Sequence, residues 1–152
     1  MPSPHARTST PDFGTTRLAA STGAFLARPE PLVSVGIDAE PHAALPGGAC
    51  RVAAVAEEQA TLARLAMTHP TMHWDRPLFS AKESISKAWY PFTRRELDFV
   101  EARLDIDRRA GAFVGHLTVD GARLTDEEKR SAVDVRYLID RDVQLTTVVV
   151  SA

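Results

Sequence analysis

Apolar and polar residues alternate in LVSVGIDAEP, a stretch that starts at Leu32. Three apolar side chains would share one side of an extended segment, and four small or polar residues the other: Val33, Val35 and Ile37 against Ser34, Gly36, Asp38 and Glu40. Side chains two positions apart lie on the same face of a strand. The alternation therefore predicts a strand over residues 32–40, ended by Pro41.

The next two segments have the composition and spacing of helices. Residues 56–67, AEEQATLARLAM, are good helix formers with leucines at helical spacing. A second helix is predicted over residues 76–89, with Asp75 placed to cap it and Pro77 in its first turn. We expect this helix to end before Pro91, because proline cannot continue the helical hydrogen-bond pattern.

Strand-forming residues dominate the remainder of the chain. Four strands are predicted, with short polar connections: LDFVEARLDID (97–107), GAFVGHLTV (111–119), DVRYLID (134–140) and VQLTTVVVS (143–151). These strands flank the helices instead of alternating with them. The pattern predicts an α+β fold, in which a mainly antiparallel sheet packs with two helices.

The first 31 residues differ from the rest, because they are rich in Ser, Thr, Pro, Gly and Ala and show no sustained period. Such a segment buries too little apolar surface to offset the entropy lost on ordering. We therefore expect residues 1–31 to form an irregular, disordered N-terminal arm without a targeting signal, and residues 32–152 to form one folded domain.

Composition excludes several functional classes. The 152 residues carry a formal net charge of −2, so no overall positive field attracts nucleic acid. No apolar run is long enough to cross a bilayer, so no membrane role is expected. The single cysteine, Cys50, excludes an intramolecular disulfide and a cysteine-built zinc site, and it suits the reducing cytoplasm.

The first chemical candidate lies at the end of the first strand. Asp38 and Glu40 share a strand face, and two carboxylates so close favour a divalent cation such as Mg²⁺, which often binds together with substrate phosphates. Gly36 would let a ligand or backbone approach, and His42 is near enough to contact a phosphate. The alternatives are that both acids are simply solvated and that His42 is an exposed loop histidine.

The second candidate is the helix FSAKESISKAWYP and its flanks. At 100° per residue, one apolar stripe should be buried: Leu78, Ala81, Ile85, Ala88, Trp89 and Phe92. Glu83 and Lys87 lie on the opposite side, four residues apart, and Lys82 lies at the boundary of the stripe. An ordinary solvated pair explains Glu83 and Lys87 equally well, at a few tenths of a kcal/mol.

The solvated-pair interpretation leaves two aromatic residues unexplained. Phe79 and Tyr90 fall on the Glu83 side, so this nominally wet face carries aromatic surface that another group should cover. A third carboxylate flanked by two lysine ammonium groups suits a metal-bound pyrophosphate, with the acid toward the cation and the lysines toward phosphate oxygens.

Both segments together resemble a known family. VGIDAEPHAALP and WDRPLFSAKESISKAWYP, in this order and with EEQATLARLA and HW between them, resemble the two signature motifs of the 4'-phosphopantetheinyl transferases, specifically the enterobactin synthetase component D-like bacterial branch. The resemblance runs from about Val33 to the C-terminus. It implies one pseudo-half of the 4'-phosphopantetheinyl transferase fold.

The resemblance implies a holo-acyl-carrier-protein synthase type of activity: transfer of 4'-phosphopantetheine from coenzyme A to a serine of an apo acyl or peptidyl carrier protein, releasing 3',5'-ADP. By the family's motifs, Asp38, Glu40 and Glu83 bind Mg²⁺. The same motifs make Lys82 and Lys87 ligands of the coenzyme A phosphates. His42, by its position after Glu40 and Pro41 and not by the motifs, is a further candidate contact for these phosphates. Glu83 and Lys87 are the expected catalytic residues, Glu83 as the base that accepts the serine proton.

The sequence also departs from this branch, whose members resemble two fused halves with coenzyme A between them. Only the second half is matched, and Ser86 stands where related sequences often have an aromatic residue. We expect a truncated or frame-shifted product, with the N-terminal half missing or supplied as a separate chain, or else a homo-oligomer with sites between subunits. The rival function is a catalytically inactive remnant or binding module that keeps the metal and carrier-protein surfaces. The motifs do not distinguish siderophore from polyketide, peptide or fatty-acid carriers.

Overall fold

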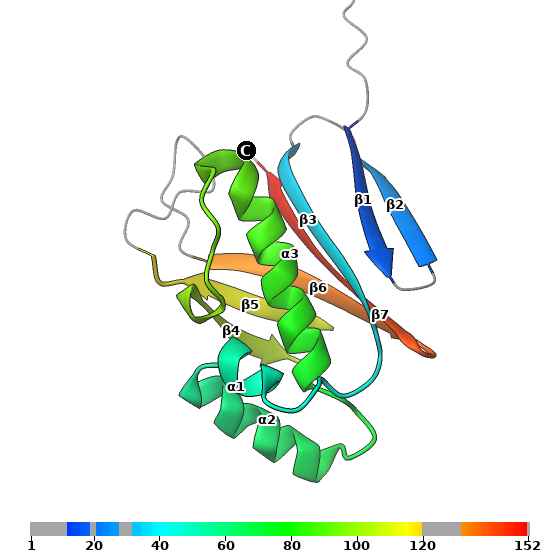
Figure 1. Ribbon diagram of the computed structural model, residues 1–152, viewed down its shortest axis with the longest axis vertical. Helices are drawn as coiled ribbons and strands as arrows, with labels where there is room; N and C mark the ends of the chain where they lie inside the picture. Colours follow the sequence, from blue (N-terminus) through cyan, green and yellow to red (C-terminus); the bar gives the residue numbers. More distant parts are fainter. Residues whose placement is uncertain (1–11, 19–20, 28–31, 120–131, 152) are drawn as a thin grey trace, which may run out of the picture.

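The computed structural model of this chain describes residues 12–18, 21–27, 32–119 and 132–151. Five antiparallel strands form one sheet in the order β3-β7-β6-β5-β4 (Figure 1). Their bounds are β3 Leu32–Pro41, β4 Ala102–Asp107, β5 Ala112–Leu117, β6 Ala132–Asp140 and β7 Val143–Ser151. This confirms the predicted α+β class with a mainly antiparallel sheet.

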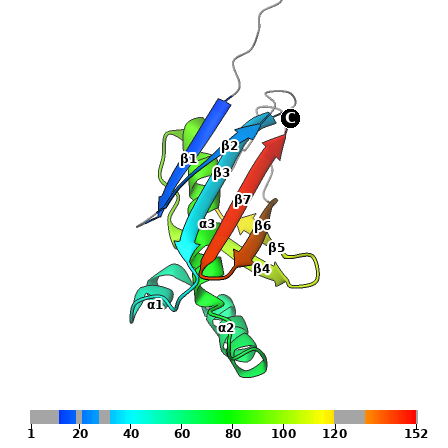
Figure 2. The ribbon, with the colours of Figure 1, turned by 90° about the vertical axis from the view of Figure 1, so that its right-hand side faces the viewer.

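Helix α3, Asp75–Thr93, crosses one face of this sheet, and Figure 2 shows it behind β3 and β7. Two shorter helices, α1 Ala49–Ala53 and α2 Ala56–Thr68, lie near the N-terminal end of α3. The apolar stripe of α3 is buried as predicted in all but one position: Leu78, Ala81, Ile85, Ala88 and Trp89. Phe92 was predicted in that stripe but is 36% exposed, because it follows the last buried turn. In the described segments, no helix combines the length and apolarity needed to cross a membrane.

Both ends of α3 differ from the prediction. Pro91 lies inside the helix, which ends only where Arg94 adopts a left-handed conformation with φ 55°. A proline this close to the C-terminus removes only one hydrogen bond of the last turn. Asp75 does not cap the helix; its carboxylate accepts a hydrogen bond from the backbone N–H of Leu45 at 2.9 Å.

The segment before β4 is also not the strand that was predicted. The Asp98 side chain accepts a hydrogen bond from the Phe99 N–H, and the Glu101 side chain accepts one from the Asp98 N–H. These two bonds stabilise a short 3₁₀ helix, η1 Phe99–Glu101, so that pairing with β5 starts only at Ala102.

The N-terminal segment contains regular structure that the sequence did not indicate. Strands β1 Asp12–Leu18 and β2 Ser21–Ala27 pair antiparallel as a separate two-stranded sheet, with β1 beside β3 (Figure 1). The prediction of an entirely irregular arm over residues 1–31 is therefore wrong for these two stretches. In these two stretches apolar residues do not alternate with polar ones, so the sequence lacks the period of two by which a strand is predicted. The start of the folded domain at residue 32 stays a prediction.

The polar side of β3 is the side that faces α3. Ser34, Gly36 and Asp38 are buried, and the Ser34 hydroxyl donates to the Ala88 carbonyl of α3 at 2.9 Å. The absence of a side chain at Gly36 lets the two backbones approach closely, beside Ser84 of α3. This close contact places the carboxylate of Asp38 directly against the helix.

Candidate active site

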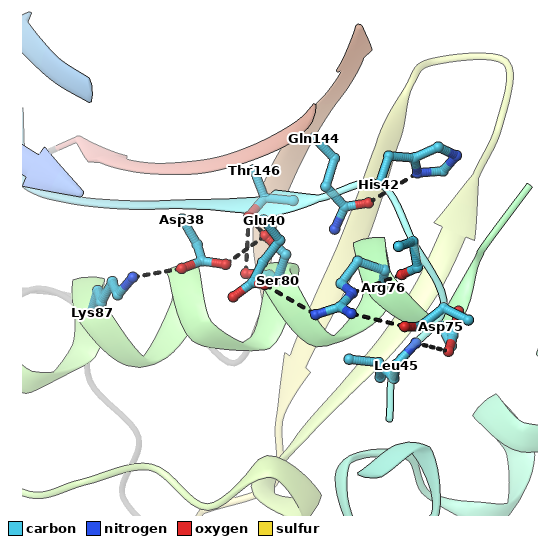
Figure 3. Close-up of polar contacts among 12 residues, drawn as sticks. Asp38, Glu40, His42, Leu45, Asp75, Arg76, Ser80, Lys87, Gln144 and Thr146 are labelled. Carbon is cyan, nitrogen blue, oxygen red and sulfur yellow. Dashed lines mark hydrogen bonds and ion pairs between the residues drawn. The ribbon is translucent and has the colours of Figure 1, made fainter. Parts of the chain in front are cut away.

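Asp38 is held between β3 and α3 by two residues of the helix. Its Oδ1 lies 2.7 Å from the Nζ of Lys87, and its Oδ2 accepts a hydrogen bond of 2.7 Å from the Ser80 hydroxyl (Figure 3). The Asp38 side chain is 7% exposed, whereas that of Lys87 is 42% exposed. The pair therefore has one buried partner and one that reaches solvent.

Glu40 lies two residues further along the same face of β3 and pairs with a different cation. Its Oε2 accepts from the Arg76 guanidinium at 3.1 Å, and that guanidinium also donates to the carbonyls of Ala43 and Ala44, each at 2.8 Å. Burial raises the pKa of the Glu40 carboxyl and the charge of Asp38 adds to the rise, while Arg76 opposes it.

Glu83, the third predicted acid, lies on α3 one turn before Lys87. Burial is the main cause that raises its pKa, and the charges of Asp38 and Glu40 add to the rise, while Lys87 opposes it. The fold thus brings the three predicted acids, from β3 and α3, within electrostatic range of one another and of Lys87.

Two of the three carboxylates are paired with protein cations in this arrangement, Asp38 with Lys87 and Glu40 with Arg76. Within residues 12–18, 21–27, 32–119 and 132–151, no group of three or more His, Cys, Asp or Glu side chains is arranged to hold a metal ion. The chemistry of the residues nevertheless fits a hard cation: three carboxylates, two of them with pKa values raised by burial and mutual repulsion, which a divalent ion would relieve. A shared metal on these three acids stays a prediction.

Lys82 lies apart from this cluster. Its ammonium group donates to the Ala53 carbonyl at 2.7 Å, to Glu58 at 2.7 Å and to the Phe99 carbonyl at 2.8 Å. The side chains of Lys82 and Glu58 are each only 1% exposed. An ammonium group has three donors, so these acceptors leave none for a phosphate. Burial lowers the Lys82 pKa, and Glu58 opposes that effect.

His42 is also directed away from the acids. Figure 3 shows its ring pointing away from Asp38 and toward Gln144. Its Nδ1 lies 3.5 Å from the Gln144 side-chain oxygen, and its ring centre is 5.5 Å from that of His73. The structure therefore groups Asp38, Glu83 and Lys87, and it does not bring Lys82 or His42 to them.

A groove of about 900 Å³ lies beside Glu83 and Lys87. The other residues that line it come from the C-terminal part of α3 and the segment that follows: Ser86, Tyr90, Pro91, Arg95, Glu96, Leu97, Asp98, Phe99 and Glu101. Tyr90 is 46% exposed here, while Phe79 packs against Phe99 with ring centres 5.2 Å apart. Of the two aromatic residues on the Glu83 side, one is thus covered by the chain itself and the other faces the groove.

Sequence reasoning missed the partners that fix the acids. Arg76 and Ser80 lie in the second family motif, but no periodic pattern distinguishes them as partners of the acids. Thr146, which contacts Ser80, lies on β7, 66 residues away. No spacing rule connects residues so distant. Only the strand order, with β7 next to β3, brings Thr146 beside Asp38.

We expect Glu83→Gln to increase stability at neutral pH, by at most about 1 kcal/mol for a half-buried charge. A carboxyl whose pKa is raised on folding contributes stability below its ordinary pKa of 4.5, and that contribution is lost as pH rises through the folded-state pKa. The neutral amide avoids the loss, so thermal melts should show a gain at pH 7 that vanishes near pH 4. Glu96→Gln, at an exposed acid, is the control. A lower melting temperature for Glu83→Gln at pH 7 would contradict the expectation that the ionised Glu83 carboxylate destabilises the fold.

Comparison with known proteins identifies the family. The model of the 4'-phosphopantetheinyl transferase superfamily matches residues 34–148. The chain is 42% identical over 130 residues to the 4'-phosphopantetheinyl transferase Svp of Streptomyces mobaraensis, which covers 86% of this chain and 52% of Svp. It is 37% identical over 139 residues to the 4'-phosphopantetheinyl transferase PptT of Mycobacterium tuberculosis, which covers 88% of this chain and 60% of PptT.

A third relative gives the same picture. The 4'-phosphopantetheinyl transferase Npt of Nocardia iowensis is 37% identical over 122 residues, covering 76% of this chain and 54% of Npt. The chain spans about half the length of the curated relatives it matches. The match to the family model includes most of β3, all of α3 and most of β7, and thus Asp38, Glu40, Glu83 and Lys87. On this basis the chain belongs to the 4'-phosphopantetheinyl transferase superfamily.

Proposed function

We propose that this chain takes part in the magnesium-dependent transfer of 4'-phosphopantetheine from coenzyme A to a serine of an apo carrier protein, as a member of the enterobactin synthetase component D-like branch. The supporting observation is that Asp38 contacts the half-exposed Lys87, with Glu40 and Glu83 within electrostatic range of both. The single cysteine, Cys50, suits the cytoplasm as its location.

The transfer requires one bond to form and one to break. The serine oxygen bonds to the phosphorus that carries the pantetheine, and the bond from this phosphorus to the oxygen of 3',5'-ADP breaks. The serine proton must leave during the attack, and Glu83 is the proposed acceptor. A raised pKa suits this task, because a base works best when its pKa approaches the working pH.

The proposed metal ligands are Asp38, Glu40 and Glu83. Mg²⁺, when bound, supplies positive charge that neutralises the pyrophosphate and the charge developing on it. Lys87 would then exchange its contact with Asp38 for a phosphate oxygen, a change that its half-exposed position allows. The groove beside Glu83 and Lys87 gives the substrates access to both side chains.

Intact-mass analysis of an apo carrier protein, incubated with coenzyme A, Mg²⁺ and this chain, tests the activity. We expect the carrier to gain the mass of phosphopantetheine, and Asp38→Asn to slow the gain by about 100-fold or more, as for loss of one charge-stabilising group. Chelation of Mg²⁺ should stop it. Asp105→Asn, the same change at an exposed acid of β4 that does not line the groove, is the matched control.

Because the chain spans about half of its relatives, the assay has a second arm. This arm adds the separately produced portion of Svp that the chain does not cover. No mass gain in either arm would overturn the proposal. In that case, a thermal shift with coenzyme A that depends on Mg²⁺ would favour the second candidate, a non-catalytic binding module.

A further inference from the structure

We infer that Ser80 and Thr146 form a buried hydroxyl pair that orients the Asp38 carboxylate toward its cation. Both are positioning residues, since they act through Asp38. The inference rests on the proposed function, because it takes Asp38 as a metal ligand. Neither residue was singled out by the sequence.

The hydrogen-bond directions in this network follow from the chemistry of the acceptors. A carboxylate oxygen can only accept, so the Ser80 hydroxyl donates to Asp38 Oδ2 at 2.7 Å. A carbonyl also only accepts, so the Thr146 hydroxyl donates to the Ser80 carbonyl at 2.9 Å. The Thr146 Oγ1 also lies 2.9 Å from the Ser80 Oγ, within hydrogen-bond distance. Each hydroxyl has one proton to donate, so Thr146 fixes the backbone of Ser80, and the Ser80 side chain fixes Asp38.

Burial makes this orientation rigid. Ser80 and Thr146 are both 0% exposed, so water does not compete for their hydroxyl groups. With Oδ2 engaged by Ser80, the other oxygen, Oδ1, is directed to the partly exposed Nζ of Lys87. Oδ1 is therefore the atom available to a cation, at the side of the carboxylate that reaches solvent. Partners of this kind typically change metal affinity by about 10- to 100-fold when removed.

Ser84 provides a matched control on the same helix. It is also 0% exposed, and its Oγ lies 2.6 Å from the Thr146 Oγ1. Asp38, however, accepts from Ser80 and not from Ser84 among the described contacts. Loss of the Ser84 hydroxyl removes a buried hydrogen bond of the same network without removing the bond to the carboxylate. Ser84→Ala therefore separates the effect of the network on protein stability from its effect on the orientation of the Asp38 carboxylate.

The experiment measures Mn²⁺ binding to the chain by electron paramagnetic resonance, together with thermal melts, for the wild type, Ser80→Ala and Ser84→Ala. We expect Ser80→Ala to weaken Mn²⁺ binding by about tenfold or more. We expect Ser84→Ala to lower the melting temperature by a similar amount as Ser80→Ala but to bind Mn²⁺ within about twofold of the wild type. Thr146→Val, which keeps the shape and loses the hydroxyl, should weaken binding as well and serves if Ser80→Ala does not fold.

Each other outcome has a definite meaning. Equal Mn²⁺ affinity in the wild type, Ser80→Ala and Thr146→Val overturns the inference alone. Equal weakening by Ser80→Ala and Ser84→Ala also overturns it, because the hydroxyl groups would then act only through stability. If the wild-type chain binds no Mn²⁺, both the inference and the proposed metal site fail.

Discussion

Lys82→Met is expected to lower the free energy of unfolding by about 3–5 kcal/mol, because it breaks a buried ion pair and leaves its partner charged. Methionine keeps the length and apolar character of the lysine stem, so the cavity term is small. The cost comes from Glu58, which is 1% exposed and would lose its only cationic partner among the described residues. The carbonyls of Ala53 and Phe99 would lose their donor as well.

The network that Lys82 holds joins several elements. Glu58 accepts from the backbone N–H of Val55 at 2.8 Å and from that of Leu104 at 2.7 Å, in addition to Lys82. One carboxylate thus connects the start of α2, the middle of α3 and strand β4. Through the Phe99 carbonyl, Lys82 also fixes η1, which lines the groove beside Glu83.

Chemical denaturation measures the loss, with Arg103→Met as the control. Arg103 pairs with Asp105 at 3.3 Å on the surface, where such pairs contribute about 1 kcal/mol or less. The double variant Glu58→Gln/Lys82→Met should regain part of the stability, since no unpaired charge remains. The experiment also tests the phosphate role that the family motif implies for Lys82. A Lys82→Met variant as stable as the wild type, but with weaker binding of coenzyme A, would support that role over the structural one.

The different outcomes for Lys82 and Lys87 show where sequence reasoning ends. Both lysines belong to the same motif, and a helical wheel places Lys82 only at the boundary of the buried stripe. Its acceptors come from α1, α2 and η1, so no local pattern reveals that the position is enclosed. Lys87 contacts Asp38, and the resemblance to the family had already predicted that the motifs containing these two residues form one site.

The fold was more predictable than the details of the site. The alternation in β3 and the stripe on α3 depend on local period, and both elements are present. The hairpin of β1 and β2 depends on backbone pairing without a hydrophobic period, and it was missed. The hydroxyl groups that hold Asp38 depend on the strand order of the sheet, which the sequence alone does not give.

Gly36 determines both how closely β3 packs against α3 and where Asp38 lies, because it has no Cβ. A Cβ at this residue would overlap the Ser84 carbonyl oxygen of α3 and lie 2.8 Å from the Ser84 carbonyl carbon and 2.9 Å from the Ala88 nitrogen. All three are backbone atoms in the middle of a helix, so no side-chain rotation relieves the contact. The strand and helix would have to separate.

Gly36→Ala is therefore expected to destabilise the protein by about 3 kcal/mol or more, the upper part of the range for overpacked cores. Gly47→Ala is the matched control: a Cβ there meets no atom within 4 Å, so its effect should be neutral or a gain of up to about 1 kcal/mol. Urea denaturation measures both variants. Where Gly36→Ala still folds, separation of β3 from α3 would also lengthen the contacts of Asp38 with Ser80 and Lys87, so Mn²⁺ binding should weaken in parallel. Wild-type stability in Gly36→Ala would mean that β3 and α3 do not pack backbone to backbone, and the position of Asp38 would then need another explanation.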